Sequence, residues 1–170
     1  MSSPLPEALI SAAERLFAER GSEAVSLREI NTAAGSTNAS AIQYHFGGRR
    51  GLVKAVLAKH EVDIERRRHE MLDAYEQRRE DDLRALAAAL VEPIAAELAT
   101  DGGPGYLQLV ADLYNRPNPT FEPGAADDPT TSLGRWRQLV RPLLSPEAVR
   151  LHRRFDSLRF AVSEVARRSR

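Results

Sequence analysis

The sequence predicts an all-α protein, for two reasons. Apolar residues recur at the spacing of amphipathic helices along almost the whole chain, as they do over residues 9–17. No alternating run rich in valine, isoleucine or threonine, the pattern typical of strands, is found in the sequence.

Two helices are expected in the first part of the chain. The first runs from about Leu5 to Arg20, because Gly21 follows as a helix-ending residue. Ser26 and Glu29 have the spacing of a capping box, in which a hydroxyl and a carboxylate each satisfy one free backbone amide. A second, short helix is therefore expected to begin after Ser26.

The next two helices are separated by glycines. Gly35 ends the second helix, and the third is expected from Asn38 or Ala39 to Phe46, after residues that are all competent N-caps. The pair Gly47–Gly48 then precedes a long fourth helix, expected from Arg49 to about Tyr75.

The remaining elements are also predicted to be helical. One helix is expected over 80–98, kinked at Pro93, which removes a backbone donor. Residues 106–114 are apolar nearly all round and predict a buried helix, and another helix is expected over 130–144. A last helix opens at Ser145-Pro146-Glu147, a cap followed by proline and an acid.

The last predicted helix carries an apolar repeat with steps of four and three residues, the a and d pattern of helix packing. Its members are Leu151, Phe155, Leu158, Val162 and Val165. The spacing favours equally a subunit interface and packing within the chain, because bundles and dimers use the same geometry.

Composition excludes several classes of protein. The 170 residues carry a formal net charge of +0, so bulk charge does not indicate a nucleic acid. Cysteine is absent, which excludes disulfides and thiolate metal sites. No signal peptide or membrane-length apolar run is present in the sequence. We expect a cytoplasmic protein that contacts no membrane and needs no cofactor or metal.

One window of the chain has the charge pattern of a DNA-binding surface. Between Glu29 and Glu61 there is no acidic residue, and short polar side chains mark a short helix at 38–46. We predict that this segment is the recognition helix of a helix-turn-helix module. Gln43 is a candidate for reading adenine, because a carboxamide can pair with that base through two hydrogen bonds. The full set of candidate DNA contacts is Ser26, Arg28, Thr37, Asn38, Ser40, Gln43, Tyr44, His45, Arg49 and Arg50.

The same residues resemble a known family. The segments 26–30, Ala33-Ala34-Gly35 and 44–52 (YHFGGRRGL) are similar to the N-terminal signature of TetR-type (tetracycline-repressor-like) bacterial regulators. Three positions depart from that signature: Gln43 replaces a common tyrosine, Arg50 replaces a usual glutamate, and Asn31 stands where a small apolar residue is typical. The turn over 35–42 is also one residue longer than in most members of the family.

The resemblance implies a three-helix DNA-binding head, residues 1–50, and a helical-bundle body for ligand binding and dimerisation, residues 51–170. It implies a homodimeric repressor that binds a palindromic operator on double-stranded DNA and is released by a small-molecule inducer of unidentified structure. The candidate pocket residues are Met71, Tyr75, Ile94, Tyr106, Leu109, Val110, Leu113, Tyr114, Phe121 and Trp136. The apolar repeat of the last helix is the candidate dimer interface.

Two other classes of function compete with a regulator. No pair of histidines has the helical spacing of metal ligands, and no phosphate-binding loop or nucleophile elbow is present in the sequence, so an enzyme is not expected. The alternative to the regulator is a helical protein-interaction module without sequence-specific DNA binding. The two differ in a measurable way, because DNA binding depends steeply on salt.

Overall fold

The computed structural model describes residues 4–78, 82–115, 128–150 and 153–169, and in this part of the chain it contains helices and no strand, as predicted. The α-helices are α1 Pro4–Arg20, α2 Leu27–Ala33, α3 Ala41–Phe46, α4 Arg49–Arg78, α5 Leu83–Ala95, α6 Gly103–Tyr114, α7 Ser132–Val140, α8 Pro146–Arg150 and α9 Arg153–Arg168. Short 3-10 turns, η1 Ala96–Ala99 and η2 Arg141–Leu143, follow α5 and α7. None of the helices described is both long and apolar enough to cross a membrane.

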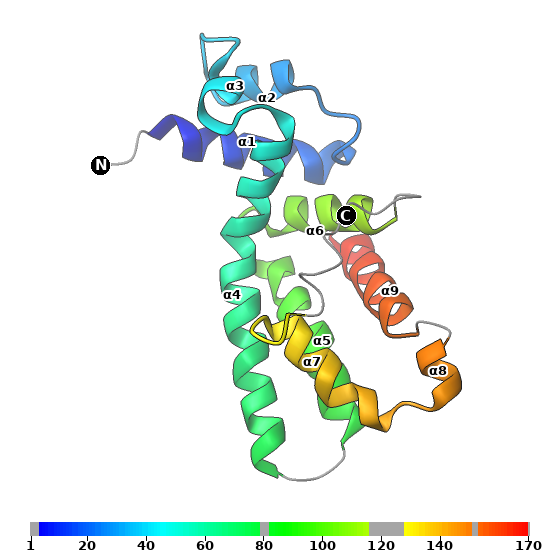
Figure 1. The fold of residues 1–170 in the computed structure, drawn as a ribbon. Coiled ribbons are helices and arrows are strands. Elements are labelled where there is room, and N and C mark those ends of the chain that lie inside the picture. The colour runs from blue at the N-terminus through cyan, green and yellow to red at the C-terminus, as the bar shows by residue number, and fades with distance from the viewer. Residues whose placement is uncertain (1–3, 79–81, 116–127, 151–152, 170) are drawn as a thin grey trace.

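The helix α4 is the longest of the described elements and connects the two parts of the molecule. Figure 1 shows α1, α2 and α3 around one end of α4, with α5 and α7 beside its remaining length and α9 farther from it. Residue 50 is therefore not in a linker, because α4 continues through it without interruption.

Two predicted helices differ from the structure at their ends. Helix α5 passes through Pro93 and ends at Ala95, and the 3-10 turn η1 follows it, so the α-helix ends three residues before the predicted end at residue 98. The single helix expected from Pro146 onward is described as two, α8 and α9, which point in different directions in Figure 1.

The core of the head is completed by residues from outside the first three helices. Its buried members are Leu9, Ala12, Ala13, Leu16, Phe17, Val25, Ile30, Ala41, Ile42, Leu52, Val56 and Leu109. Leu52 and Val56 come from α4, and Leu109 comes from α6. The core of the head is therefore separate from the core of the body, but it includes residues of α4 and α6.

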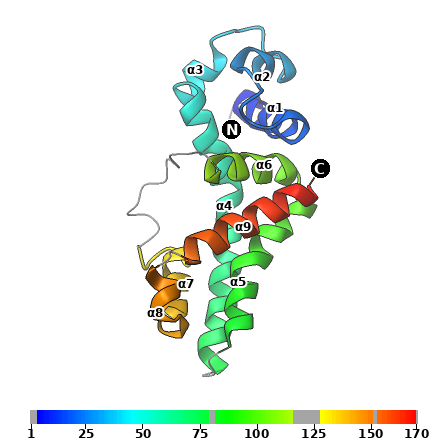
Figure 2. The ribbon, with the colours of Figure 1, turned by 90° about the vertical axis from the view of Figure 1, so that its right-hand side faces the viewer.

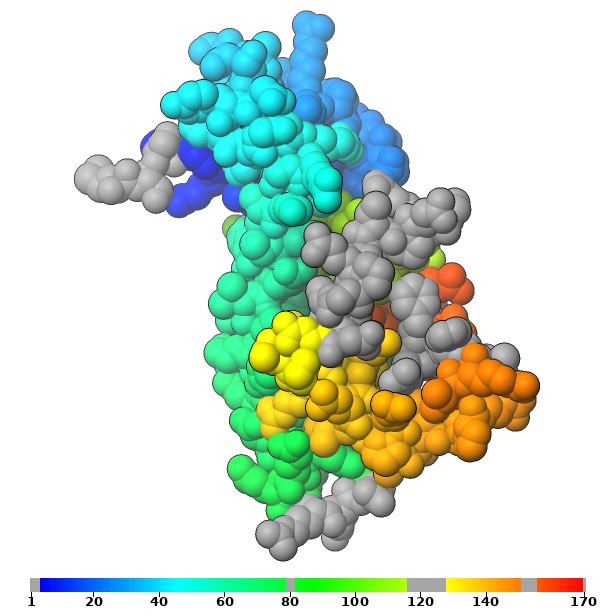
Figure 3. All heavy atoms as spheres, viewed as in Figure 1, coloured from blue at the N-terminus to red at the C-terminus, as the bar shows by residue number. Residues whose placement is uncertain are grey.

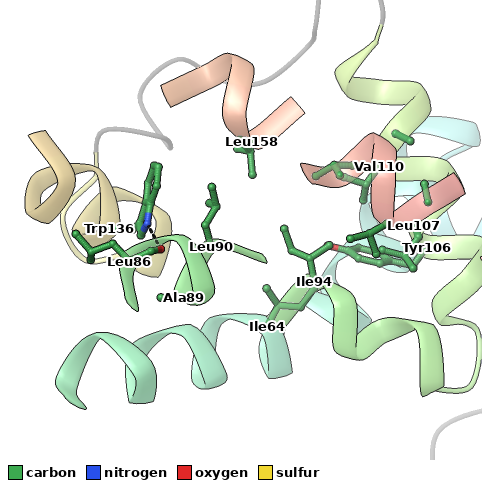
Figure 4. Packing of buried hydrophobic residues seen from close by; sticks show 14 of the residues in the cluster. Ile64, Leu86, Ala89, Leu90, Ile94, Tyr106, Leu107, Val110, Trp136 and Leu158 are labelled. Atoms are coloured by element: carbon green, nitrogen blue, oxygen red, sulfur yellow. Dashed lines mark hydrogen bonds between the residues drawn. The ribbon is translucent and has the colours of Figure 1, made fainter. Parts of the chain in front are cut away.

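The core of the body lies between α4, α5, α6, α7 and α9 (Figure 4). Trp136 of α7 is 4% exposed, and its indole N–H donates to the carbonyl of Leu86 at 2.7 Å. Arg68 of α4 is also buried, and it donates to the carbonyl of Ala89 and to the hydroxyl of Ser132. These bonds give the buried indole of Trp136 and the buried guanidinium of Arg68 hydrogen-bond partners inside the core.

Helix α6 supports the head from below. Figures 1 and 2 both place α6 directly under α1. A side chain at Gly105 would put its Cβ 1.9 Å from the backbone oxygen of Glu14, so only glycine permits this close approach. Ser22 adds a second contact, because its backbone N–H and its hydroxyl both donate to Asp112, at 2.8 and 2.6 Å.

Candidate nucleic-acid interface

The start of α2 has the capping box that the sequence predicts. The Ser26 hydroxyl accepts from the Glu29 amide at 3.2 Å, and the Glu29 carboxylate accepts from the Ser26 amide at 2.8 Å. The hydrogen bonds from Ser26, followed by the one from Arg20, lower the pKa of Glu29 to about 2. Glu29, the acidic residue that precedes the acid-free window, is therefore paired with the Ser26 cap of α2 and with Arg20.

The turn between α2 and α3 is held by its own polar side chains. The Ser40 amide donates to the Asn38 side chain at 2.9 Å, and the Asn38 amide donates to the Ser36 hydroxyl at 3.2 Å. Because these bonds stabilise a turn, α3 begins at Ala41, and the prediction of a helix start at 38 or 39 was wrong.

Asn31 anchors this turn from beneath. It is 4% exposed, and its side-chain N–H donates to the carbonyl of Ala39 at 2.9 Å. The sequence marks Asn31 as a departure from the family signature but gives no indication of its partner, which lies eight positions further along the chain.

Helix α3 presents a polar outer face. Gln43 and Tyr44 are exposed, Tyr44 by 83%, whereas Ala41 and Ile42 are buried in the core of the head. The rings of Tyr44 and His45 meet edge to face, with centroids 4.9 Å apart. Figure 3 shows this cyan segment at the end of the molecule farthest from α5 and α7.

The angle between α3 and α4 is fixed by close packing. Gly48 has a φ of 106°, which L side chains rarely adopt, and a Cβ at Gly51 would lie 1.6 Å from the backbone oxygen of Phe46. The recognition helix and the start of α4 therefore hold one geometry.

Arg49 has a structural role that the sequence did not predict. Its guanidinium donates to the carbonyl of Val25 at 2.7 Å and to the carbonyl of Ser22. These bonds tie the start of α4 to the loop between α1 and α2. Arg50, the next residue, is exposed, as is Lys54 one turn later.

All the candidate DNA contacts lie on α2, α3, the turn between them, or the first residues of α4, together with the cap Ser26. Those with exposed side chains are Ser26, Arg28, Thr37, Asn38, Ser40, Gln43, Tyr44 and Arg50. His45 and Arg49 are half-buried. The exposed candidates are uncharged polar residues except for two arginines, Arg28 on α2 and Arg50 on α4.

Most of the candidate pocket residues fill core rather than line a cavity. Met71, Tyr75, Ile94, Tyr106, Val110 and Tyr114 pack in the core of the body, and Leu109 and Leu113 pack in the core of the head. Phe121 lies outside the described residues. For the five candidates on α6 the physical reason is that this helix is apolar on almost every side and contributes to both cores.

A hollow of about 650 Å³ lies elsewhere, along α5, α7 and α9. Its apolar lining includes Leu86, Leu90, Trp136 and Phe160, so Trp136 is the one candidate pocket residue, among those that the structure describes, that borders it. Glu164 and Arg168 also line it, and the carboxylate of Glu164 pairs with both Arg168 and Arg167, at 2.9 Å each.

The apolar repeat of the last helix packs within the chain at its described positions. Leu158, Val162 and Val165 are 8%, 1% and 5% exposed and belong to the core of the body. Leu151 lies outside the described residues, as does the side chain of Phe155. Of the two alternatives for the repeat, packing within the chain accounts for these three residues, and the candidate dimer interface stays a prediction.

Comparison with known proteins agrees with this geometry. Residues 9–56 match the family model described as bacterial regulatory proteins, tetR family. The head is a TetR-family DNA-binding domain. The chain is therefore a DNA-binding transcriptional regulator, and the match covers α1 from Leu9 onward, α2, α3 and the first two turns of α4. No curated protein matches the chain.

Proposed function

We propose that this TetR-family regulator is a ligand-released repressor that binds a palindromic operator as a homodimer through residues 38–46. The observation that carries the proposal is the outer face of α3, where Gln43 and Tyr44 are exposed at one end of the molecule. A helix about 10 Å in diameter fits the major groove of B-DNA, which is about 12 Å wide.

The exposed residues divide into two kinds of contact. Gln43 points outward from α3 and has the chemistry to pair with an adenine edge. Arg28 and Arg50 are exposed on either side of α3 in the sequence, where they suit phosphate contacts that orient the helix without specifying bases. Two such heads related by a twofold axis would read two half-sites about 34 Å apart, which is why we propose a palindrome.

The hollow beside α5, α7 and α9 is the proposed site for the inducer. Its volume of about 650 Å³ falls within the range of small-molecule sites, and its lining is mostly apolar. Glu164, the one acid among the described residues of the lining, is already paired with Arg167 and Arg168, and most of the other lining residues are apolar, so the lining favours an apolar compound. Such a compound would reduce DNA binding only as far as it prefers the conformation with the lower operator affinity.

Selection of bound sequences from random duplex DNA tests the DNA-binding part of the proposal. The expected result is one motif with twofold symmetry, and binding that weakens steeply with added salt because neutralised phosphates release counterions. An asymmetric motif would contradict the homodimer. No enrichment, together with salt-independent binding, would favour the protein-interaction module instead.

The ligand site is tested with the sole tryptophan. Trp136 borders the hollow, so a neutral aromatic probe such as N-phenyl-1-naphthylamine should quench its fluorescence on binding. The variant Ala87→Phe, which fills the hollow from α5, should abolish the quenching, and Ala74→Phe on the exposed side of α4 is the matched control. Equal quenching in both variants would place the probe elsewhere.

A further inference from the structure

A buried histidine bridges the head and the body. His60 of α4 is 5% exposed, and its Nε2 lies 2.9 Å from the carboxylate of Glu14, on α1 of the head. Its Nδ1 lies 2.6 Å from the carboxylate of Glu97, on η1 of the body. Both carboxylates are almost completely buried. Because a neutral imidazole has only one N–H, both contacts are hydrogen bonds only when His60 is an imidazolium.

The surrounding groups complete a balanced cluster of charges. Lys59 Nζ contacts both oxygens of Glu14, at 2.9 and 2.7 Å, and the hydroxyl of Thr100 donates to Glu97 at 2.8 Å. The ring of Tyr106, on α6, stacks on the imidazole with centroids 4.7 Å apart. Two carboxylates therefore face two cations, and an aromatic ring covers one of the cations, which stabilises it further.

The protonation of His60 follows from these contacts. Burial acts to lower the pKa of His60, but hydrogen bonds to Glu14 and Glu97 outweigh it and raise the pKa to about 9. Burial likewise acts to raise the pKa of Glu97, and the hydrogen bonds from His60 and Thr100 outweigh it, so this pKa lies below its ordinary value. The other charges of α4 nearby are Arg67, which acts on Glu97, and Glu61, which acts on Tyr106.

We propose that His60 is a positioning residue for DNA binding, whose positive charge holds the head at a fixed orientation on the body. This proposal rests on the proposed function as a dimeric operator-binding protein. Glu14 lies on the helix against which the rest of the head packs, and it is the residue that Gly105 approaches most closely. Without the charge on His60, the two buried carboxylates lose the cation that they share. Their burial then costs free energy, and a movement of α1 away from η1 relieves that cost.

A comparison of full and half operators tests this role. A half-site duplex binds one head, whose internal packing does not involve His60, whereas a palindrome requires both heads in the correct orientation. For His60→Gln we expect an affinity for the selected palindrome that is lower by about 5- to 150-fold, the usual range of coupling between sites, and an unchanged affinity for the half-site. His69→Gln is the matched control, since His69 lies on the same helix but away from the cluster.

A second substitution separates charge from packing. The double variant His60→Gln/Glu97→Gln removes one positive and one negative charge, so the cluster is balanced again, and it should recover most of the affinity for the palindrome. In the wild type, the preference for the palindrome over the half-site should fall as pH rises through about 9, and in His60→Gln it should not change.

Several results would overturn the proposal. One is an NMR titration that places the pKa of His60 near 6.5, and another is a His60→Gln variant that binds the palindrome like the wild type. If His60→Gln does not fold in a thermal melt, the pH dependence of the wild type decides alone. Failure of the wild type to bind any duplex would refute the DNA-binding function itself, which is a separate outcome.

Discussion

Replacing Arg49 by alanine should destabilise the head while leaving the salt dependence of DNA binding nearly unchanged. The guanidinium of Arg49 donates to the carbonyls of Val25 and Ser22 and so joins α4 to the loop between α1 and α2. A hydrogen bond from a charged group contributes about 1.5–3 kcal/mol to stability. Because Arg49 is half-buried, we take the lower value for each bond and expect a loss of about 3 kcal/mol in the free energy of unfolding.

Urea denaturation measures this loss, and anisotropy of a labelled operator over a series of salt concentrations measures the phosphate contacts. Arg50→Ala is the matched control, because Arg50 is adjacent in the sequence and exposed. It should retain wild-type stability and lower the slope of log K against log salt by about 0.9 for each phosphate that Arg50 neutralises. If Arg49→Ala instead keeps full stability and lowers that slope by about 0.9, the guanidinium serves a phosphate and the structural role is refuted.

Three further predictions concern single side chains. Gln43→Ala should relax the preference for one base by about 1–3 kcal/mol in a competition assay with substituted operators, and an equal loss over all sequences would reassign Gln43 to the backbone. Ser26→Ala should lower the free energy of unfolding in urea by about 0.5–2 kcal/mol, because it removes the cap of α2. The pKa of His60 is raised from 6.5 to about 9 in the folded chain, so its contribution to stability is complete below pH 6.5 and is lost as pH rises through 9. At 1.36 kcal/mol per pKa unit that contribution is about 3 kcal/mol, and His60→Gln should remove this part of the pH dependence measured by urea titration.

The parts of the head that the sequence predicted well depend on contacts between near neighbours. The capping box of Ser26 and Glu29 is complete within four residues, so its pattern is visible in the sequence and the structure contains it. The start of α3 was misplaced by two or three residues because Asn38 can either cap a helix or hold a turn, and nothing local decides between the two.

The parts that could not be predicted depend on residues far apart in the sequence. Arg49 meets Ser22 across 27 positions, and His60 meets Glu14 across 46, so no local pattern pairs them. The hollow beside Trp136 likewise exists only through the arrangement of α5, α7 and α9. Large apolar residues in the sequence indicate burial, and only the assembled helices show which of them border a cavity.

The shared core of the head has a consequence for engineering. Leu52, Val56 and Leu109 pack with the residues of α1, α2 and α3. A chimera that takes only residues 1–50 from this protein would therefore lack three members of the core of the head. A transplanted N-terminus would need the first two turns of α4 and a compatible α6 as well. Substitutions at Gln43 and Tyr44 are therefore the simplest way to change the operator preference, because both side chains are exposed and neither belongs to the core.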